Sequence, residues 1–181
     1  GNVAVGYSAL NADCGNDNTA VGKAALAVFT GSNVTAIGSG AATAITAVTN
    51  LTAVGKNALT ALTHADGSNN TAIGAYSSDA LQAGTNLGHS NTAVGAYSYS
   101  GSLDGMRNTA LGKSALHAGD CANDNTSVGY NTLYNFTGSN ATVVGSGAAH
   151  AAVGQTNLTA IGKGALAALG TGPTSVGNNN T

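Results

Sequence analysis

Thr19-Ala20-Val21-Gly22 is one copy of a four-residue motif that recurs along the whole chain. The Gly of this motif returns after 15 to 21 residues, most often after 16 or 17. An aliphatic residue precedes the Gly in every copy, and Thr stands three positions before it in ten of the eleven copies. A short repeat of this kind is typical of solenoids, in which each repeat forms one coil of a stack. The repeat Gly residues are Gly6, Gly22, Gly38, Gly55, Gly74, Gly95, Gly112, Gly129, Gly145, Gly162 and Gly177.

The motif has the period-two alternation of a β-strand. Thr19 and Val21 are expected on one face of the strand, with the Ala and the Gly on the other. A second apolar pair follows three and four residues after the Gly, as in Ala25-Leu26, and predicts a second short strand. The sequence therefore predicts an all-β fold, a parallel β-solenoid of about eleven coils with two strands and two turns each.

Asn stands before the first predicted strand in ten coils and indicates a tight turn there. Asn and Gly tolerate the left-handed backbone conformations that such turns need. In some coils the Asn directly precedes the strand, and in others it stands one residue earlier. The first group includes Asn18, Asn91, Asn108 and Asn125, and the second includes Asn33, Asn50, Asn140 and Asn157.

The composition fits a thin core of small side chains. Of the 181 residues, 43% are hydrophobic and 27 are Gly, whereas only 4% are aromatic and 7% are charged. The single Pro and the regular repeat argue against a disordered chain. The net charge of -2 gives no reason to expect nucleic acid as a partner. The apolar runs are too short to span a membrane, so no membrane insertion is expected in this segment.

A longer repeat is superimposed on the coils. Residues 14–59 and 121–166 match at a constant offset of 107 residues, which corresponds to six coils. We therefore interpret residues 1–181 as a single continuous repeat region. Both ends of the sequence fall inside a coil, which leads us to expect a window on a longer fibre.

The two faces of the predicted strand indicate association between chains. If Ala and Gly pack inside the coil, the column of Val and Ile must be covered from outside. If Val and Ile lie inside, the bare Ala and Gly face allows a neighbouring chain to approach closely. A single chain is poorly covered with either orientation, so parallel, in-register neighbours are expected.

Asn33-Val34-Thr35-Ala36-Ile37-Gly38, followed by small residues and another Gly-bearing turn, resembles the head repeat of trimeric autotransporter adhesins of the YadA type. The resemblance covers essentially the whole chain and rests on a pattern repeated eleven times. Related repeats occur in tail fibres of phages and large viruses, and the Thr-Ala-Val-Gly form followed by Ala-Leu is similar to those. The resemblance implies a left-handed parallel β-roll, a homotrimer, and a role in attachment at an extracellular, cell or virion surface.

No combination of residues indicates catalysis, and we expect neither an enzyme nor a cofactor. The chain has no Glu, and its four His residues lie in different coils, at unequal positions and without a matching nucleophile and acid. Solvated turn residues are the simpler interpretation of His64, His89, His117 and His150. Gly112-Lys113-Ser114 matches only the end of a phosphate-binding loop and is not expected to bind nucleotides.

Charged residues occupy particular places in the coil. Each of the four Lys directly follows a repeat Gly, a position expected to face solvent, and Tyr7 and Tyr130 occupy it in other coils. This column is either a ligand-binding stripe or, more simply, a solubilising edge. Asx side chains near two turns offer oxygen atoms to Ca²⁺, although such side chains more often bond their own backbone, and we predict no metal site. The Lys residues are Lys23, Lys56, Lys113 and Lys163, and the Asx residues are Asp13, Asn16 and Asp17, with Asp120, Asn123 and Asp124 as counterparts.

Seven Asn-x-Thr sequences are candidate glycosylation sites, which matter if the source glycosylates secreted proteins. They begin at Asn33, Asn50, Asn69, Asn135, Asn140, Asn157 and Asn179. Cys14 and Cys121 occupy equivalent places six coils apart, about 29 Å along the axis, whereas a disulfide needs Cα atoms within about 7 Å. We therefore predict that they do not pair within one chain. They are either buried thiols or candidates for interchain disulfides.

Three functions remain open. The leading hypothesis is a structural extracellular fibre or adhesin head, a stiff rod displayed for attachment to a surface receptor or for filament building. The same architecture serves as the shaft of a phage or viral tail fibre. An ice-binding solenoid is the third hypothesis, because a straight file of Thr can match a crystal surface. We expect the file from Thr19 to Thr174 to be largely inaccessible, which would argue against ice binding.

Overall fold

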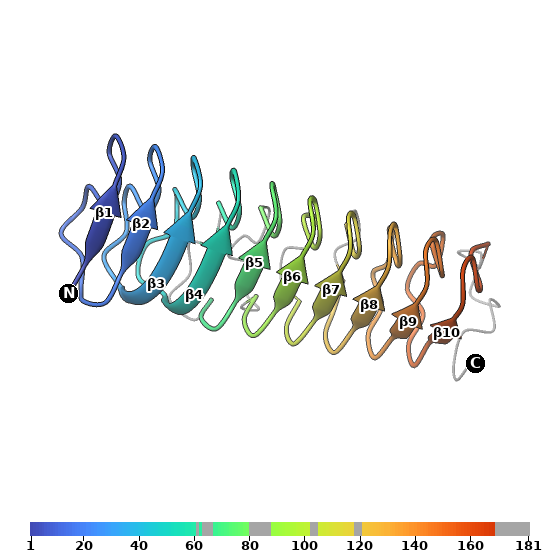
Figure 1. Ribbon diagram of the computed structural model, residues 1–181. Coiled ribbons are helices and arrows are strands. Elements are labelled where there is room, and N and C mark those ends of the chain that lie inside the picture. Colours follow the sequence, from blue (N-terminus) through green and yellow to red (C-terminus); the bar gives the residue numbers. More distant parts are fainter. Residues whose placement is uncertain (61, 63–66, 80–87, 102–104, 118–120, 169–181) are drawn as a thin grey trace.

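The computed structural model describes residues 1–60, 62, 67–79, 88–101, 105–117 and 121–168, and these residues form a parallel β-solenoid. Ten strands lie side by side in chain order and make one parallel sheet along the rod (Figure 1). Each strand belongs to a separate coil, which we number after its strand, and within the described ranges there is no helix. The strands are β1 (Val3–Val5), β2 (Thr19–Val21), β3 (Ser32–Ile37), β4 (Thr49–Val54), β5 (Thr71–Ile73), β6 (Thr92–Val94), β7 (Thr109–Leu111), β8 (Thr126–Val128), β9 (Thr142–Val144) and β10 (Thr159–Ile161).

The repeat Gly directly follows the strand in every described coil, from Gly6 after β1 to Gly162 after β10. The sequence predicts about eleven coils, and the structure describes ten strands. The last expected coil, which would contain Gly177, lies outside the described residues.

The strands pair in register from one end of the sheet to the other. The Thr at the start of the motif pairs with the Thr of the next coil, as between Thr92 and Thr109. The repeat Gly continues the pairing beyond the strand. Its N–H donates to the carbonyl of the aliphatic residue in the preceding coil, as from Gly95 N to Ile73 O at 2.7 Å. The period of the sequence repeat therefore becomes a set of columns along the rod, most of them made of one kind of residue, with exceptions such as Ser127 and Val143 among the Ala.

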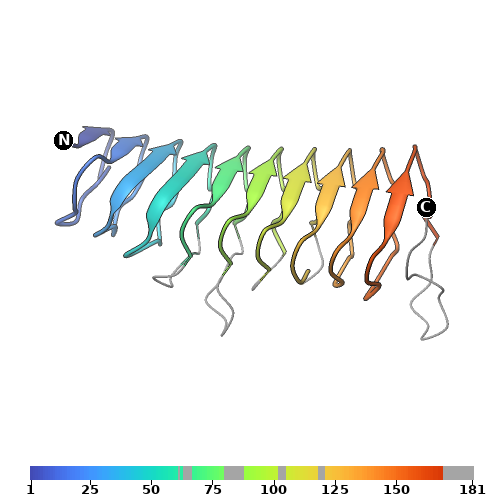
Figure 2. The ribbon, with the colours of Figure 1, turned by 90° about the horizontal axis from the view of Figure 1, so that it is seen from below.

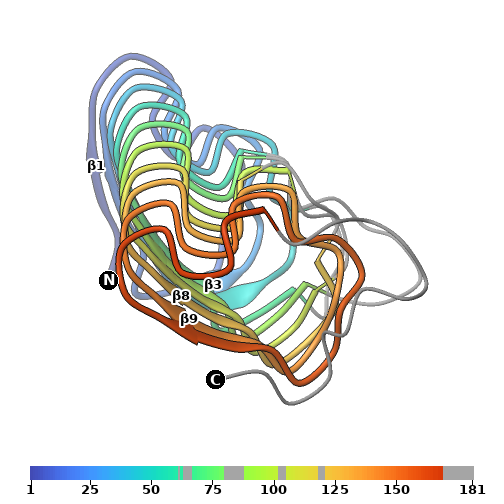
Figure 3. The same cartoon turned by 90° about the vertical axis from the view of Figure 1, so that its right-hand side faces the viewer.

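The stack of coils twists along the rod, as β-sheets normally do. Figure 2 shows the strand arrows changing direction steadily from β1 to β10. Figure 3, a view along the rod, shows the strands superposed on one side of the coil and the turns on the others.

Ala side chains point into the coil, whereas the Thr and aliphatic side chains of the strands point out. Ala20, Ala72 and Ala93, each in the middle of a strand, are completely buried. The Thr and the aliphatic residue on either side of each are half-buried or exposed. The sequence leaves open whether Ala or the aliphatic residues face the inside of the coil, and in the structure Ala does. The chain therefore does not cover its own aliphatic column.

Much of the rest of the core comes from the segment after the repeat Gly, and aliphatic residues directly before the motif Thr, such as Val34, add to it. Leu26 and Leu133 are fully buried there, at equivalent places in the two matched segments. Phe29 and Phe136, which are also equivalent, are buried as well. The interior is thin and consists mainly of Ala and Leu, as the composition indicates.

The predicted second strand is wrong. The residues after the repeat Gly form turns, and each described coil contains only one strand. Alternate residues in this segment have positive φ, for example 56° at Ala24 and 52° at Leu26. Left-handed residues do not fit an extended strand, although the Leu side chain still packs inward. Hydrogen bonds to the neighbouring coils stabilise this conformation. Ala24 N donates to Tyr7 O at 2.8 Å, and Leu26 N donates to Ala41 O at 3.1 Å.

The repeat Gly residues form a column in which no larger residue fits. Gly95 has a φ of 135°, which is unfavourable for any residue with a side chain. A Cβ atom added to Gly95 would lie 2.5 Å from the carbonyl oxygen of Gly112 in the next coil. Backbone conformation and coil spacing therefore both require Gly at this position.

The Asn residues before the strands have two different roles. Asn directly before the motif is buried and joins successive coils, because the side-chain oxygen of Asn91 accepts a hydrogen bond from Asn108 N at 2.9 Å. Asn108 accepts from Asn125 N in the same way, also at 2.9 Å. The side-chain nitrogen of Asn91 donates to the Gly105 carbonyl at 2.8 Å. Asn one residue earlier is instead exposed and left-handed, with a φ of 61° at Asn33.

Candidate functional site

The Thr and the aliphatic residue of the repeat motif point outward from the strands and, with Val3 in place of Thr in β1, form one continuous surface, which we call the outer face. In-register pairing places the Thr residues in one file and the aliphatic residues in a second file beside it. Ile73 is 39% exposed and Leu111 is 47% exposed. The members of the outer face are Val3, Val5, Thr19, Val21, Thr35, Ile37, Thr52, Val54, Thr71, Ile73, Thr92, Val94, Thr109, Leu111, Thr126, Val128, Thr142, Val144, Thr159 and Ile161.

The Thr file is more accessible than the sequence analysis predicts. Thr92 and Thr142 are exposed, and the other Thr residues of the outer face are half-buried. The prediction that this file is largely inaccessible is therefore wrong for the single chain, because Ala fills the inside of the coil and turns Thr outward. Thr174 lies outside the described residues.

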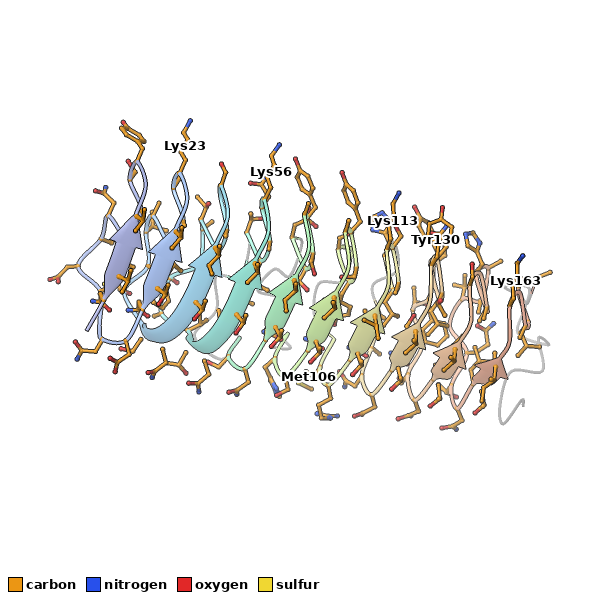
Figure 4. All side chains as sticks on the ribbon, in the orientation of Figure 1. Lys23, Lys56, Met106, Lys113, Tyr130 and Lys163 are labelled. Atoms are coloured by element: carbon orange, nitrogen blue, oxygen red, sulfur yellow. The ribbon has the colours of Figure 1, made fainter. Side chains whose placement is uncertain are left out.

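The Lys column faces solvent, as predicted. The four Lys residues and Tyr130 line one edge of the rod, at the turn after the strands (Figure 4). Tyr7 is also exposed. Lys56 Nζ lies 5.5 Å from the centre of the Tyr76 ring, a distance typical of a cation-π contact. Hydrogen bonding to Tyr76 raises the pKa of Lys56 above its usual value.

The sequence Gly112-Lys113-Ser114 lies in the turn after β7. Lys113 is exposed and Ser114 is buried. Ser114 N donates to Ala96 O of the preceding coil at 3.0 Å, so this backbone belongs to the solenoid stack. The segment from here to His117 is a turn, not the helix that a phosphate-binding loop would have.

Five aromatic and His side chains form a column that the sequence analysis missed. The ring centres are 5.1 Å apart between Tyr76 and Tyr97, and 5.9 Å apart between Tyr97 and His117. The column continues from His117 to Tyr134 at 5.0 Å, and from Tyr134 to His150 at 5.2 Å. We call these five side chains, one in each of coils 5 to 9, the ring ladder.

The prediction that the His residues lie at unequal positions is wrong for two of them. His117 and His150 both stand five residues after a repeat Gly, as does Tyr134 between them. An alignment of the coils on the repeat Gly reveals these three residues in the sequence, but not Tyr76 and Tyr97, which stand two residues after their repeat Gly. His89 lies in a different part of its coil, and His64 is outside the described residues.

The surroundings of His117 come closest to a catalytic arrangement. Its Nδ1 atom lies 3.0 Å from the carbonyl oxygen of Tyr97 and also contacts the Ser100 hydroxyl. Nδ1 donates to the Tyr97 carbonyl when it carries the ring proton, and it accepts from the Ser100 hydroxyl when the proton is on Nε2.

Asp79 adds a half-buried carboxyl group near the ring ladder. Burial raises its pKa above the usual 3.8, whereas the hydrogen bond from its own backbone and the attraction of His117 act in the opposite direction. Within the described residues, no three His, Cys, Asp or Glu side chains gather in a way that could hold a metal ion.

The Asx residues considered for Ca²⁺ lie at the turn before the strands. Asp124 is exposed and forms an ion pair with Arg107, with distances of 2.7 and 2.8 Å. The hydrogen bonds from Arg107 lower the pKa of Asp124. Asp120 lies outside the described residues. The remaining members are exposed or half-buried, namely Asp13, Asn16, Asp17 and Asn123.

Six of the seven candidate glycosylation sites are exposed, and Asn179 lies outside the described residues. Five of the six share one place in the coil, two residues before the Thr, and have positive φ. They form a column along the edge before the strands, where Asn50 donates to Asn69 at 3.3 Å. This column contains Asn33, Asn50, Asn69, Asn140 and Asn157, whereas Asn135 lies in a later turn of its coil.

Cys14 and Cys121 are not joined by a disulfide, which agrees with their predicted separation. Cys14 is half-buried and Cys121 is buried. Their participation in interchain disulfides stays a prediction.

No helix in the described part of the chain is long and apolar enough to cross a membrane. Comparison of the chain with protein-family models, curated proteins and solved structures gives no match. The function is therefore inferred from the surfaces of the solenoid itself.

Proposed function

We propose that this chain is part of a structural extracellular fibre, in which three rods associate side by side through the outer face. The observation that supports this proposal is the continuous, outward-pointing column of aliphatic and Thr side chains. Contiguous apolar surface on a soluble protein is typical of an interaction site.

The chemistry of the outer face resembles that of an interface core. It contains only Thr, Val, Ile and Leu, and none of its members is charged. Charged side chains lie instead at the two edges of the sheet, with Lys56 and Lys113 on one edge and Arg107 and Asp124 on the other. An apolar centre with a charged rim is the usual anatomy of a protein interface.

The outer face offers each chain a narrow strip for association. A three-residue strand spans about 10 Å, and ten strands spaced by about 4.8 Å extend for about 48 Å, which gives about 480 Å² for each chain. Two chains facing each other would bury about 960 Å² in one interface, and three chains around one axis would bury about 1,400 Å² shared among three interfaces. The area alone therefore does not select three chains over two, and the number three rests on the resemblance.

The resemblance to YadA-type head repeats and to tail-fibre repeats supports the same proposal. A left-handed roll, a homotrimer and display on a cell or virion surface are the parts of the proposal that rest on this resemblance. Within the fibre, the solenoid acts as a stiff spacer or adhesive head. Labelling of native cells and virions with antibodies to this chain, followed by electron microscopy, tests the location and distinguishes an adhesin from a tail fibre.

The interface is tested by placing charges on the outer face. The double variant Ile73→Lys/Leu111→Lys would bury two unpaired charges per chain if the face is an interface, and each such charge costs several kcal/mol. We therefore expect the sedimentation mass to fall from three chains to one. The control is Ser39→Lys/Ser146→Lys, at the edge position that Lys occupies naturally in four coils, and it should leave the mass unchanged. A wild-type mass retained by the outer-face variant would contradict the proposal.

Ice binding is the second candidate, because the Thr file is accessible in the single chain. The twist of the sheet in Figure 2 argues against it, since a flat ice plane cannot follow a twisted file of hydroxyl groups. Thermal hysteresis measured on the purified protein decides between the two functions. Activity that disappears in Thr92→Tyr/Thr109→Tyr without loss of folding would replace the fibre proposal with ice binding.

A further inference from the structure

The ring ladder is a continuous feature of the rod surface. Its rings follow one another at 5.0 to 5.9 Å through five consecutive coils. Lys56 covers the ring at the first end of the ladder. Tyr97 is 41% exposed, and the other four rings are half-buried. The ladder is therefore accessible to a ligand along its length.

The fold does not require these rings. Tyr134 and His150 correspond, at the offset of 107 residues, to Ala27 and Thr43. Coil 2, which contains Ala27, forms a strand and a turn like those of coil 8, and coil 3, which contains Thr43, has a turn like that of coil 9 after a longer strand. The buried Leu and Phe side chains of coil 2 are the same as those of coil 8, whereas the buried Ile45 of coil 3 is Ala152 in coil 9. The rings are thus an addition to one part of the rod, which points to a role in recognition.

The stacking determines what kind of ligand suits the ladder. Tyr76 is parallel to Tyr97 within 5°, and Tyr134 is parallel to His150 within 11°. Within each of these two pairs the rings cover one another's faces, whereas Tyr97 meets His117 at 83° and His117 meets Tyr134 at 49°. Nucleic-acid bases bind to free ring faces, so they do not suit this surface. Ring edges carry partial positive charge, and the Tyr hydroxyls and His nitrogens exchange hydrogen bonds, which suits a ligand rich in oxygen.

The charges near the ladder favour an uncharged ligand. Lys56 lies at one end of the ladder and Asp79 attracts His117 in its middle, so the formal charges of Lys56 and Asp79 cancel. Nδ1 of His117 contacts the Tyr97 carbonyl. Nε2 is therefore the ring nitrogen that remains for a hydrogen bond to a ligand. A row of ring side chains repeated once per coil fits a polymer whose units repeat at a similar interval.

We propose that the ring ladder binds a neutral, extended polysaccharide whose chain runs along the rod. Each coil advances by about 4.8 Å, close to the length of one sugar unit in an extended glycan. The five rings would then contact about five consecutive sugars through their hydroxyl and ring-oxygen atoms. This site is separate from the outer face, so the proposal does not depend on the association of chains.

The test measures binding of cellohexaose, xylohexaose and mannohexaose by isothermal titration calorimetry, with the acidic hexagalacturonate as the comparison. Tyr134→Ala/His150→Thr introduces the residues that the matched coils already contain, so the variant is expected to fold. Tyr130→Ala is the control, because it removes an exposed Tyr of coil 8 that lies outside the ladder. Thermal melting of all three proteins reports their folding.

We expect at least one neutral hexasaccharide to bind the wild-type chain. The ladder variant should bind it about tenfold more weakly, equivalent to about 1.4 kcal/mol, with an unchanged melting temperature. The Tyr130→Ala control should bind normally. The proposal is overturned if no neutral hexasaccharide binds, if the ladder variant binds as well as the wild type, if the control loses binding equally, or if hexagalacturonate binds most tightly.

Discussion

Replacement of a single repeat Gly should destabilise the rod strongly. Gly95→Ala forces a side chain onto a residue with a φ of 135°, which costs about 1–3 kcal/mol. The new Cβ atom would also lie 2.5 Å from the Gly112 carbonyl oxygen, so the two coils must move apart. This movement weakens the hydrogen bonds from Gly112 to Val94 and from Ser114 to Ala96, which join these two coils and each contribute about 0.5–1.5 kcal/mol. The expected loss in the free energy of unfolding is therefore about 2–6 kcal/mol.

Gly147→Ala is the matched control for this substitution. Gly147 has a φ of 65°, and an added Cβ would have no atom within 4 Å. Ala24 already adopts a φ of 56° at the same place in its coil. We expect this variant to lose only about 1–2 kcal/mol. Urea denaturation followed by circular dichroism, at equal protein concentrations, gives both values, and equal losses for the two variants would refute the stacking argument.

Three further predictions concern buried and titrating side chains. Asn108→Ala removes the acceptor of Asn125 N and should cost about 2–4 kcal/mol in urea denaturation, whereas Asn140→Ala, at an exposed turn, should cost about 1 kcal/mol or less. Equal costs would show that the buried Asn column does not stabilise the stack. Burial raises the pKa of Asp79, so its contribution to stability is present below the usual 3.8 and is lost as pH rises through the folded-state pKa. Asp79→Asn should therefore raise the melting temperature near neutral pH, and this gain should vanish in acid; a gain that is independent of pH would count against the assignment. Hydrogen bonds from Arg107 lower the pKa of Asp124, so its stabilisation is present above the usual 3.8 and is lost as pH falls through the folded-state pKa. Melting temperatures of Asp124→Asn should depend less on acidity than those of the wild type, and identical acid profiles would contradict this.

The stack and its register could be predicted because the sequence repeats at the level of single residues. A Gly preceded by an aliphatic residue marks the end of every described strand, and the alternation before it is that of a strand. The inside of the coil could not be predicted from this pattern, because Ala and Val are both apolar. The distinction depends on the width of the coil, which admits Ala20 and turns Val21 outward.

The second strand was mispredicted because an apolar pair does not reveal the backbone conformation. Leu26 packs inward from a left-handed conformation that Leu rarely adopts, and hydrogen bonds to the next coil maintain it. The ring ladder was missed for another reason. Tyr97 stands two residues after its repeat Gly and His117 stands five after its own, so only the folding of the turn brings their rings together.

Sedimentation equilibrium of the wild-type chain tests the central claim, that the outer face is covered by neighbouring chains. At micromolar concentration, we expect a mass three times the 17.3 kDa of the chain. The outer face of each rod would then be enclosed, and its exposed Ile and Leu side chains would be buried between copies. A well-folded species with the mass of one chain would contradict the account, because the aliphatic column of ten coils would then remain in contact with water.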